Sequence, residues 1–100
     1  MIIGALEHGE IRIFDDVEHV MREWGSYPSD VESAVITFYD ADGVWLEPIA
    51  SNDSFQLRRN ETPDAAVDQI GVALFETTNL CPNPHVTSLD ELRARFPFSN

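Results

Sequence analysis

The chain has 100 residues, of which 43% are hydrophobic and 10% aromatic, and its formal net charge is −12 at pH 7. A chain of this length can bury one modest core, and its apolar content is too high for a disordered acidic tail, so we expect a single acidic domain spanning residues 1–100. Its negative field would repel phosphate backbones and anionic lipid, which argues against nucleic-acid binding and membrane-surface binding.

The first quarter of the chain predicts a β-hairpin followed by a helix. Two β-prone runs, Ile2–Leu6 and Glu10–Phe14, flank a Glu-His-Gly turn whose glycine can adopt a positive φ. Asp15 is then expected to be the N-cap of the helix, and Glu18 can reach back to the amide of that cap. Apolar residues at i, i+3, i+4 and i+7 predict one helix face in a core, and Gly25 marks the end of the helix. These apolar residues are Val17, Val20, Met21 and Trp24.

The middle of the chain predicts a second hairpin and one further strand. Residues 34–39 are a β-branched and aromatic run, an Asp-Ala-Asp-Gly turn follows, and residues 44–47 return as the partner strand. Pro48 is expected to confine that strand to an edge or to end it early, because proline cannot donate to a ladder. Residues 54–58 alternate between apolar and polar, as a half-exposed strand does, and residues 26–32 are expected to be a polar connection.

The last third predicts two helices. Residues 62–64 supply a capping hydroxyl, a first-turn proline and a first-turn acid. Residues 80–86 contain two prolines and are expected to be a loop, and residues 88–91 form a capping box for a short helix that Pro97 ends. The order ββ-α-ββ-β-α-α predicts an α+β fold with a mostly antiparallel sheet of about four to five strands and helices packed on one face.

No pattern of catalytic or cofactor-binding residues is recognisable. A glycine-rich phosphate loop and a Ser-His-Asp grouping are absent from the sequence, and carboxylates are too numerous to indicate an acid–base pair. Asp40 and Asp42 match the opening of a calcium loop, but its twelfth position is Ser51 instead of glutamate. Cys81 and His85 lack two further zinc ligands in sequence, and a nucleophile–base pair from them is not expected. We therefore expect no enzyme activity, metal or cofactor.

The negative charge is concentrated in the first half of the chain. Residues 1–53 hold twelve acids and two arginines, a net charge of −10, whereas residues 54–100 have a net charge of −2. Such a field would steer a basic protein toward the first half. The chain has no run of eighteen apolar residues, its first residues lack the basic flank of a signal peptide, and its lone Cys81 fits a reducing compartment, so the cytoplasm is the expected location.

The second hairpin is the expected binding surface, because aromatic residues beside carboxylates dominate protein interfaces. Phe38 and Leu46 are the natural inward-facing residues of this hairpin. If Tyr39 and Trp45 face outward instead, they lie among several acids and form an aromatic and acidic surface. The candidate partner-binding residues are Asp15, Asp16, Tyr39, Asp40, Asp42, Trp45 and Glu47.

With its length, its acidity, a helix over residues 15–24 that leads into the hairpin over 34–47, and no catalytic residues, the chain resembles bacterial immunity proteins. These proteins protect bacteria from polymorphic or contact-dependent growth inhibition toxins. The resemblance implies a tight one-to-one complex with a basic toxin domain, often a nuclease, whose active site or neighbouring surface is blocked. The free protein would be a monomer or a weak homodimer. The alternative is a small acidic regulatory or assembly domain that homodimerises without catalytic activity.

Overall fold

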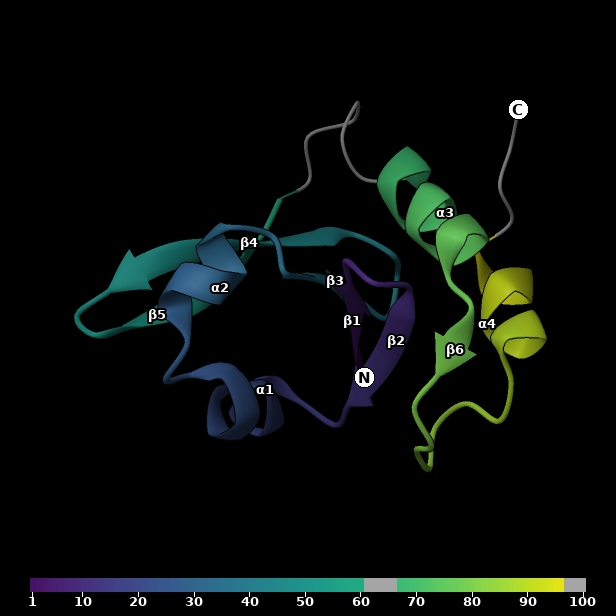
Figure 1. The fold of residues 1–100 in the computed structure, drawn as a ribbon, viewed down its shortest axis with the longest axis horizontal. Helices are drawn as coiled ribbons and strands as arrows, with labels where there is room; N and C mark the ends of the chain where they lie inside the picture. The colour runs from purple at the N-terminus through teal and green to yellow at the C-terminus, as the bar shows by residue number, and fades with distance from the viewer. Residues whose placement is uncertain (61–66, 97–100) are drawn as a thin grey trace.

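The computed structural model describes residues 1–60 and 67–96, with the side chains of 67–69 left out. Over these ranges the chain forms an α+β fold with an open, mostly antiparallel six-stranded sheet and four helices (Figure 1), which confirms the predicted fold class. The elements are β1 (Ile2–Leu6), β2 (Glu10–Phe14), α1 (Val17–Trp24), α2 (Pro28–Glu32), β3 (Ile36–Asp40), β4 (Trp45–Ser51), β5 (Ser54–Arg59), α3 (Val67–Glu76), β6 (Asn79–Leu80) and α4 (Leu89–Arg95).

The strands lie in the order β5-β4-β3-β1-β2-β6, so the first strand of the chain is near the centre of the sheet. Both predicted hairpins are present, and β5 pairs antiparallel to β4 as a further strand. The turn before β2 contains Gly9 at the positive φ that the sequence predicted, +92°, and the predicted turn before β4 contains Gly43 at φ +83°. β6 is the exception to the antiparallel pattern, because it pairs parallel to β2.

Both faces of the sheet are buried, because its strands send alternate residues into two hydrophobic clusters. The first cluster involves α1 and α2 and contains Ile2, Leu6, Phe14, Val20, Val31, Ile36, Phe38, Leu46 and Phe55. The second involves α3 and α4 and contains Ile3, Ile11, Ile13, Tyr39, Ile70, Leu74, Val86 and Leu92. The expected placement of the helices on one face is therefore wrong: α1 and α2 lie on one side of β1 and β3, and α3 and α4 on the other (Figure 1).

The start of α1 lies one residue later than predicted. Asp16, not Asp15, is the N-cap, and its side chain accepts the His19 N–H at 2.9 Å. His19 also takes the part expected of Glu18, because its Nδ1 accepts the Asp15 N–H at 3.0 Å. The ring of the histidine three residues after the cap thus bonds the amide of the residue before the cap, not the amide of the cap itself as in a capping box. The helix ends at Gly25 as predicted.

Two short elements were not predicted. Residues 28–32, expected to be a polar connection, form α2, which begins with Pro28 and buries Val31. Residues 79–80, of which the second was expected to begin the loop, form β6, and the N–H of Cys81 directly after it donates to the Ile11 carbonyl at 2.9 Å. The predicted helix start at residues 62–64 lies outside the described residues. The last helix has Ser88 as its N-cap and ends at Phe96, as expected.

Pro48 lies within β4 at the point where this strand has parted from β3. The β3–β4 ladder of the described chain ends at the pair formed by Phe38 and Leu46. Beyond Leu46, β4 continues to pair with β5 as far as Ser51. The expected edge position or early end of this strand is therefore wrong: β4 lies between β5 and β3 and continues to Ser51, because at Pro48 its partner is β5.

The β4–β5 hairpin depends on Phe55, which is 1% exposed and stacks on Phe38 with ring centroids 6.3 Å apart. We predict that Phe55→Ala lowers the free energy of unfolding by about 3–5 kcal/mol, because it leaves a cavity in the first cluster. The neighbouring exposed Gln56→Ala is the control and should change it by less than about 0.5 kcal/mol. Urea unfolding measures both, and equal losses would contradict the packing described here.

Candidate functional site

Asp40 and Asp42 form the turn between β3 and β4, where an arginine of β5 neutralises them. The Asp40 Oδ1 accepts the N–H groups of Asp42 and Val44 at 2.9 and 3.0 Å. Arg59 lies 2.8 Å from the other oxygen of Asp40 and 3.3 Å from Asp42. Asp40 thus holds the turn together, whereas Asp42, with a side chain 78% exposed, is the more accessible carboxylate.

The other predicted acids also have partners within the chain. Glu47 of β4 forms an ion pair with Arg58 of β5 at 2.8 Å. Asp16 caps α1, and Asp15 lies 2.6 Å from the His85 Nε2. The hydrogen bond from His85 holds the pKa of Asp15 below its usual range. These contacts leave the carboxylates with local structural roles, although Asp15 and Asp42 remain more than half exposed.

The acids do converge at one end of the sheet. The register places Ile2 of β1 opposite both Phe14 of β2 and Asp40 of β3, so the acids after Phe14 and the turn acids after β3 lie at the same end. Two strand spacings, about 10 Å, separate them. Glu47 lies further along β4, opposite Arg58. The sequence named these acids as candidates but predicted neither their meeting at one end of the sheet nor their ion pairs.

The predicted aromatic residues do not form an outward surface. Tyr39 is only 4% exposed and belongs to the second hydrophobic cluster, so the outward alternative for its side chain is wrong. Trp45, its cross-strand partner, is half-buried against the same cluster. Phe38 and Leu46 are buried on the opposite face, as expected. Tyr39, on the other face, is buried as well, because α3 and α4 cover that face of the sheet.

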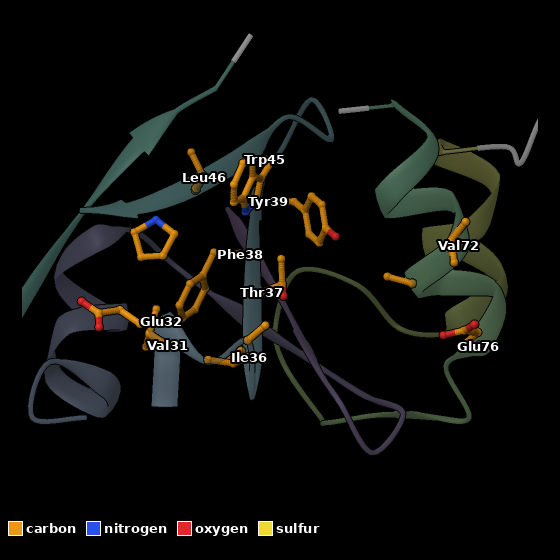
Figure 2. Close-up of a pocket in the computed structure, with 13 residues that line it drawn as sticks. Val31, Glu32, Ile36, Thr37, Phe38, Tyr39, Trp45, Leu46, Val72 and Glu76 are labelled. Atoms are coloured by element: carbon orange, nitrogen blue, oxygen red, sulfur yellow. The ribbon is translucent and has the colours of Figure 1, made fainter. Parts of the chain in front are cut away.

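The parting of β3 and β4 opens an apolar groove with a cavity volume of about 530 Å³. We call it the β3 groove. Its walls come from β3, β4, α2 and α3, and in Figure 2 the strand β3 runs down its middle with Phe38 directed to the α2 side and Tyr39 to the α3 side. The lining residues are Val31, Glu32, Ala34, Ile36, Thr37, Phe38, Tyr39, Trp45, Leu46, Pro48, Val72, Ala73 and Glu76.

Two acids supply the charge of the β3 groove. Glu32 comes from α2 and Glu76 from α3, and Figure 2 shows them on opposite sides of β3. Both are exposed, and neither has an ion-pair partner among residues 1–60 and 67–96. No arginine lines the groove in the described chain. An apolar recess with two unpaired carboxylates at its borders suits an apolar group that carries positive charge nearby.

Sequence reasoning missed the β3 groove, although one of its signals was present. Pro48 within a strand run indicated a break in pairing, but nothing in the sequence placed α2 and α3 on either side of that break. In the described ranges, no group of three or more His, Cys, Asp and Glu side chains could hold a metal ion. No helix there is both long and apolar enough to cross a bilayer.

Comparisons of the chain with protein-family models, with curated proteins and with solved structures found no match.

The two turn acids give a matched pair for testing the structural role of Asp40. We predict that Asp40→Ala lowers the free energy of unfolding by about 1–2 kcal/mol, because two backbone N–H groups lose their acceptor. Asp42→Ala removes an equal charge and a surface ion pair, so its effect should stay within about 0.5 kcal/mol. Urea unfolding of both variants makes the comparison, and a larger loss for Asp42→Ala would refute the assignment.

Tyr39 should make stability depend on alkaline pH. Burial raises the pKa of Tyr39 to about 12, against about 10 for an exposed phenol. A raised pKa means that the folded state favours the neutral phenol, so this stabilisation is fully present below about pH 10 and is lost as the pH rises toward about 12. Tyr39→Phe should remove this part of the decline in urea-unfolding free energy, whereas Tyr27→Phe, at a side chain 55% exposed, serves as control.

Proposed function

We propose that this protein binds and neutralises a basic partner protein, as an immunity protein blocks its cognate toxin. The observation that carries the proposal is the β3 groove, an apolar recess bordered by the carboxylates of Glu32 and Glu76, which have no ion-pair partner within the part of the chain that the structure describes. An apolar recess with carboxylates at its border suits a partner's apolar anchor residue that is flanked by Lys or Arg side chains. The expected cytoplasmic location and the nuclease activity of the partner belong to the same proposal.

Long-range charge would govern how fast the partner arrives. The first half of the chain carries a net charge of −10, and it includes α2 and both strands that form the groove. A field of one sign speeds the association of an oppositely charged partner and loses strength as salt is added. Carboxylates of this half would also compete with substrate phosphates for the basic residues of a nuclease.

Apolar contacts would govern how long the complex lasts. Half-buried Trp45 and the buried Leu46 line the β3 groove on the β4 side, and Val72 of α3, 42% exposed, lines it on the other. Covering such surfaces removes apolar area from water, which slows dissociation more than it changes association.

The test begins with affinity capture from lysate of the source cell at low and at high salt. The expected partner is a basic protein that arrests growth when expressed alone and is harmless when this chain is co-expressed. We predict that Glu32→Gln/Glu76→Gln weakens binding of that partner by roughly tenfold, because two charge pairs at the groove border are lost. Titration calorimetry at low salt measures the change.

The control is Glu18→Gln/Asp53→Asn, which also removes two negative charges, but from residues that do not line the groove. It should slow association slightly and leave the dissociation rate unchanged. A captured protein that does not affect growth, or equal weakening by both double variants, would refute the proposal.

The rival function is homodimerisation, and one observation favours it. Phe75 of α3 is 75% exposed, and the exposed Val72 lies on the same helix. Exposed apolar side chains of this size mark contact surfaces. Two copies, each with a net charge of −12, would repel one another, which is why we rank the basic partner first. Light scattering separates the two: a stable dimer that Phe75→Asp disrupts would establish the rival.

A further inference from the structure

A second recess, which we call the aromatic corner, lies between β2, α1 and α2. Its cavity volume is about 370 Å³, and its lining residues are Arg12, Glu23, Trp24, Tyr27 and Asp30. Arg12 points to the α1 and α2 face of the sheet, because it is two residues from Phe14 of the first hydrophobic cluster. None of the five lining residues belongs to the β3 groove. The aromatic corner is therefore a separate candidate site.

Two aromatic side chains shape this recess. The ring centroids of Trp24 and Tyr27 are 6.3 Å apart, and the rings are inclined at 71°. Tyr27 is 55% exposed, whereas Trp24 is half-buried and packs on one side against the first cluster. Rings at this inclination enclose a corner whose walls are ring faces, and a ring face carries the negative part of the aromatic quadrupole. The recess therefore attracts a cation.

The Trp24 ring offers the recess its π-system and no hydrogen bond. Its Nε1 is covered by protein and has no hydrogen-bond partner within the described ranges. A ligand in the recess therefore does not reach the indole N–H. Recognition at this ring comes from stacking and from charge, which favours a cation over a neutral polar ligand.

Two exposed carboxylates lie beside the rings, Glu23 of α1 and Asp30 of α2. The His19 Nε2 lies 3.2 Å from Glu23, but the Nδ1 of the same ring accepts the Asp15 N–H and so carries no proton. The imidazole is therefore neutral and leaves the charge of Glu23 in place. The carboxylate of Asp30 has no ion pair among residues 1–60 and 67–96.

The arginine that lines the recess is already paired. The Arg12 Nε donates to Glu10 of the same strand at 2.9 Å, so the two charges offset each other. Glu23 and Asp30 then leave the recess with a net negative charge. The half of the chain around it has a net charge of −10, which adds to the attraction of a cation.

α2 joins the aromatic corner to the β3 groove. Asp30 lines the first and Glu32 lines the second. Residues two apart lie about 200° apart around a helix, so the two carboxylates are on opposite sides of α2. A protein surface that covers α2 meets both recesses at once. This proximity favours a protein as the occupant over a free metabolite.

We propose that the aromatic corner binds an arginine side chain of a partner protein. Its guanidinium stacks on the rings of Trp24 and Tyr27 and donates hydrogen bonds to the carboxylates of Glu23 and Asp30. Arginine fits this recess better than lysine, because its planar guanidinium both stacks on an aromatic face and presents a fork of donors. Only the identity of this partner with the basic protein that fills the β3 groove rests on the proposed function.

A blocked peptide tests the site without the natural partner. The probe is acetyl-Gly-Arg-Gly-amide, titrated into the isotopically labelled full chain and followed by the NMR signals of the Trp24 indole and the Tyr27 amide. We expect saturable shifts of both. The same peptide with citrulline, a neutral isostere of arginine, should bind at least about fivefold more weakly, and the peptide with lysine roughly twofold to threefold more weakly. Equal binding of the arginine and citrulline peptides would overturn the proposal.

Two substitutions of one residue test the role of the rings. Tyr27→Leu removes a ring and should weaken binding of the arginine peptide roughly threefold to fivefold. Tyr27→Phe keeps the ring and should leave binding within about twofold. Both variants should fold, because the side chain is more than half exposed. Unchanged binding by Tyr27→Leu, or equal weakening by both variants, contradicts recognition by stacking.

A matched pair of double variants tests the role of the carboxylates. Glu23→Gln/Asp30→Asn should weaken binding of the arginine peptide roughly fivefold, because two nearby charges are lost. Glu18→Gln/Asp53→Asn removes two acids that do not line the recess and should leave binding within about twofold. Equal weakening would mean that only the overall field attracts the peptide, which would overturn the site.

The outcomes separate this inference from the proposed function. A toxic basic protein captured by the chain, whose binding Tyr27→Leu leaves unchanged, would overturn the inference and leave the proposed function standing. Arginine-selective peptide binding at the aromatic corner, with no toxic basic protein captured, would do the reverse. Free L-arginine that binds more tightly than the blocked peptide would identify a metabolite as the occupant and overturn the assignment to a partner protein.

Discussion

Burial of both faces of the sheet is the constraint on which the rest of this structure depends. Adjacent residues of β1, Ile2 and Ile3, belong to different hydrophobic clusters, and so do Phe38 and Tyr39 of β3. A sheet of this kind needs helices on each side, because neither face can be left in water. α1 and α2 cover one face and α3 and α4 the other, so the groove beside β3 is lined by a helix from each side.

The β3 groove follows from that constraint together with one proline. β4 leaves β3 before Pro48 but stays paired with β5, whose Phe55 is buried in the first cluster. β4 therefore pairs with β3 only at its start, whereas further along it pairs with β5 and holds Phe55 in the first cluster. The result is an apolar groove bordered by two carboxylates in a strongly acidic chain.

Local sequence signals predicted the elements whose determinants lie within a few residues. Turn glycines and strand alternation predicted both hairpins, and an apolar period of 3.6 residues predicted α1. The cap of α1 is Asp16, whose side chain accepts the His19 N–H, while the His19 ring accepts the N–H of Asp15, the residue before the cap. α2 and β6 escaped prediction because five and two residues are too short for a period to be visible, so tertiary contacts stabilise them.

The sequence by itself determined the α+β class, the two hairpins and the acidic field, because each depends on composition or on neighbouring residues. Only the tertiary structure decided that Tyr39 is buried, that Arg58 and Arg59 neutralise acids of the second hairpin, and that Glu32 and Glu76 flank one groove. These features join residues far apart in the chain. Their positions depend on which face each helix covers, and a sequence period does not specify that choice, because an apolar stripe fits either face of a sheet.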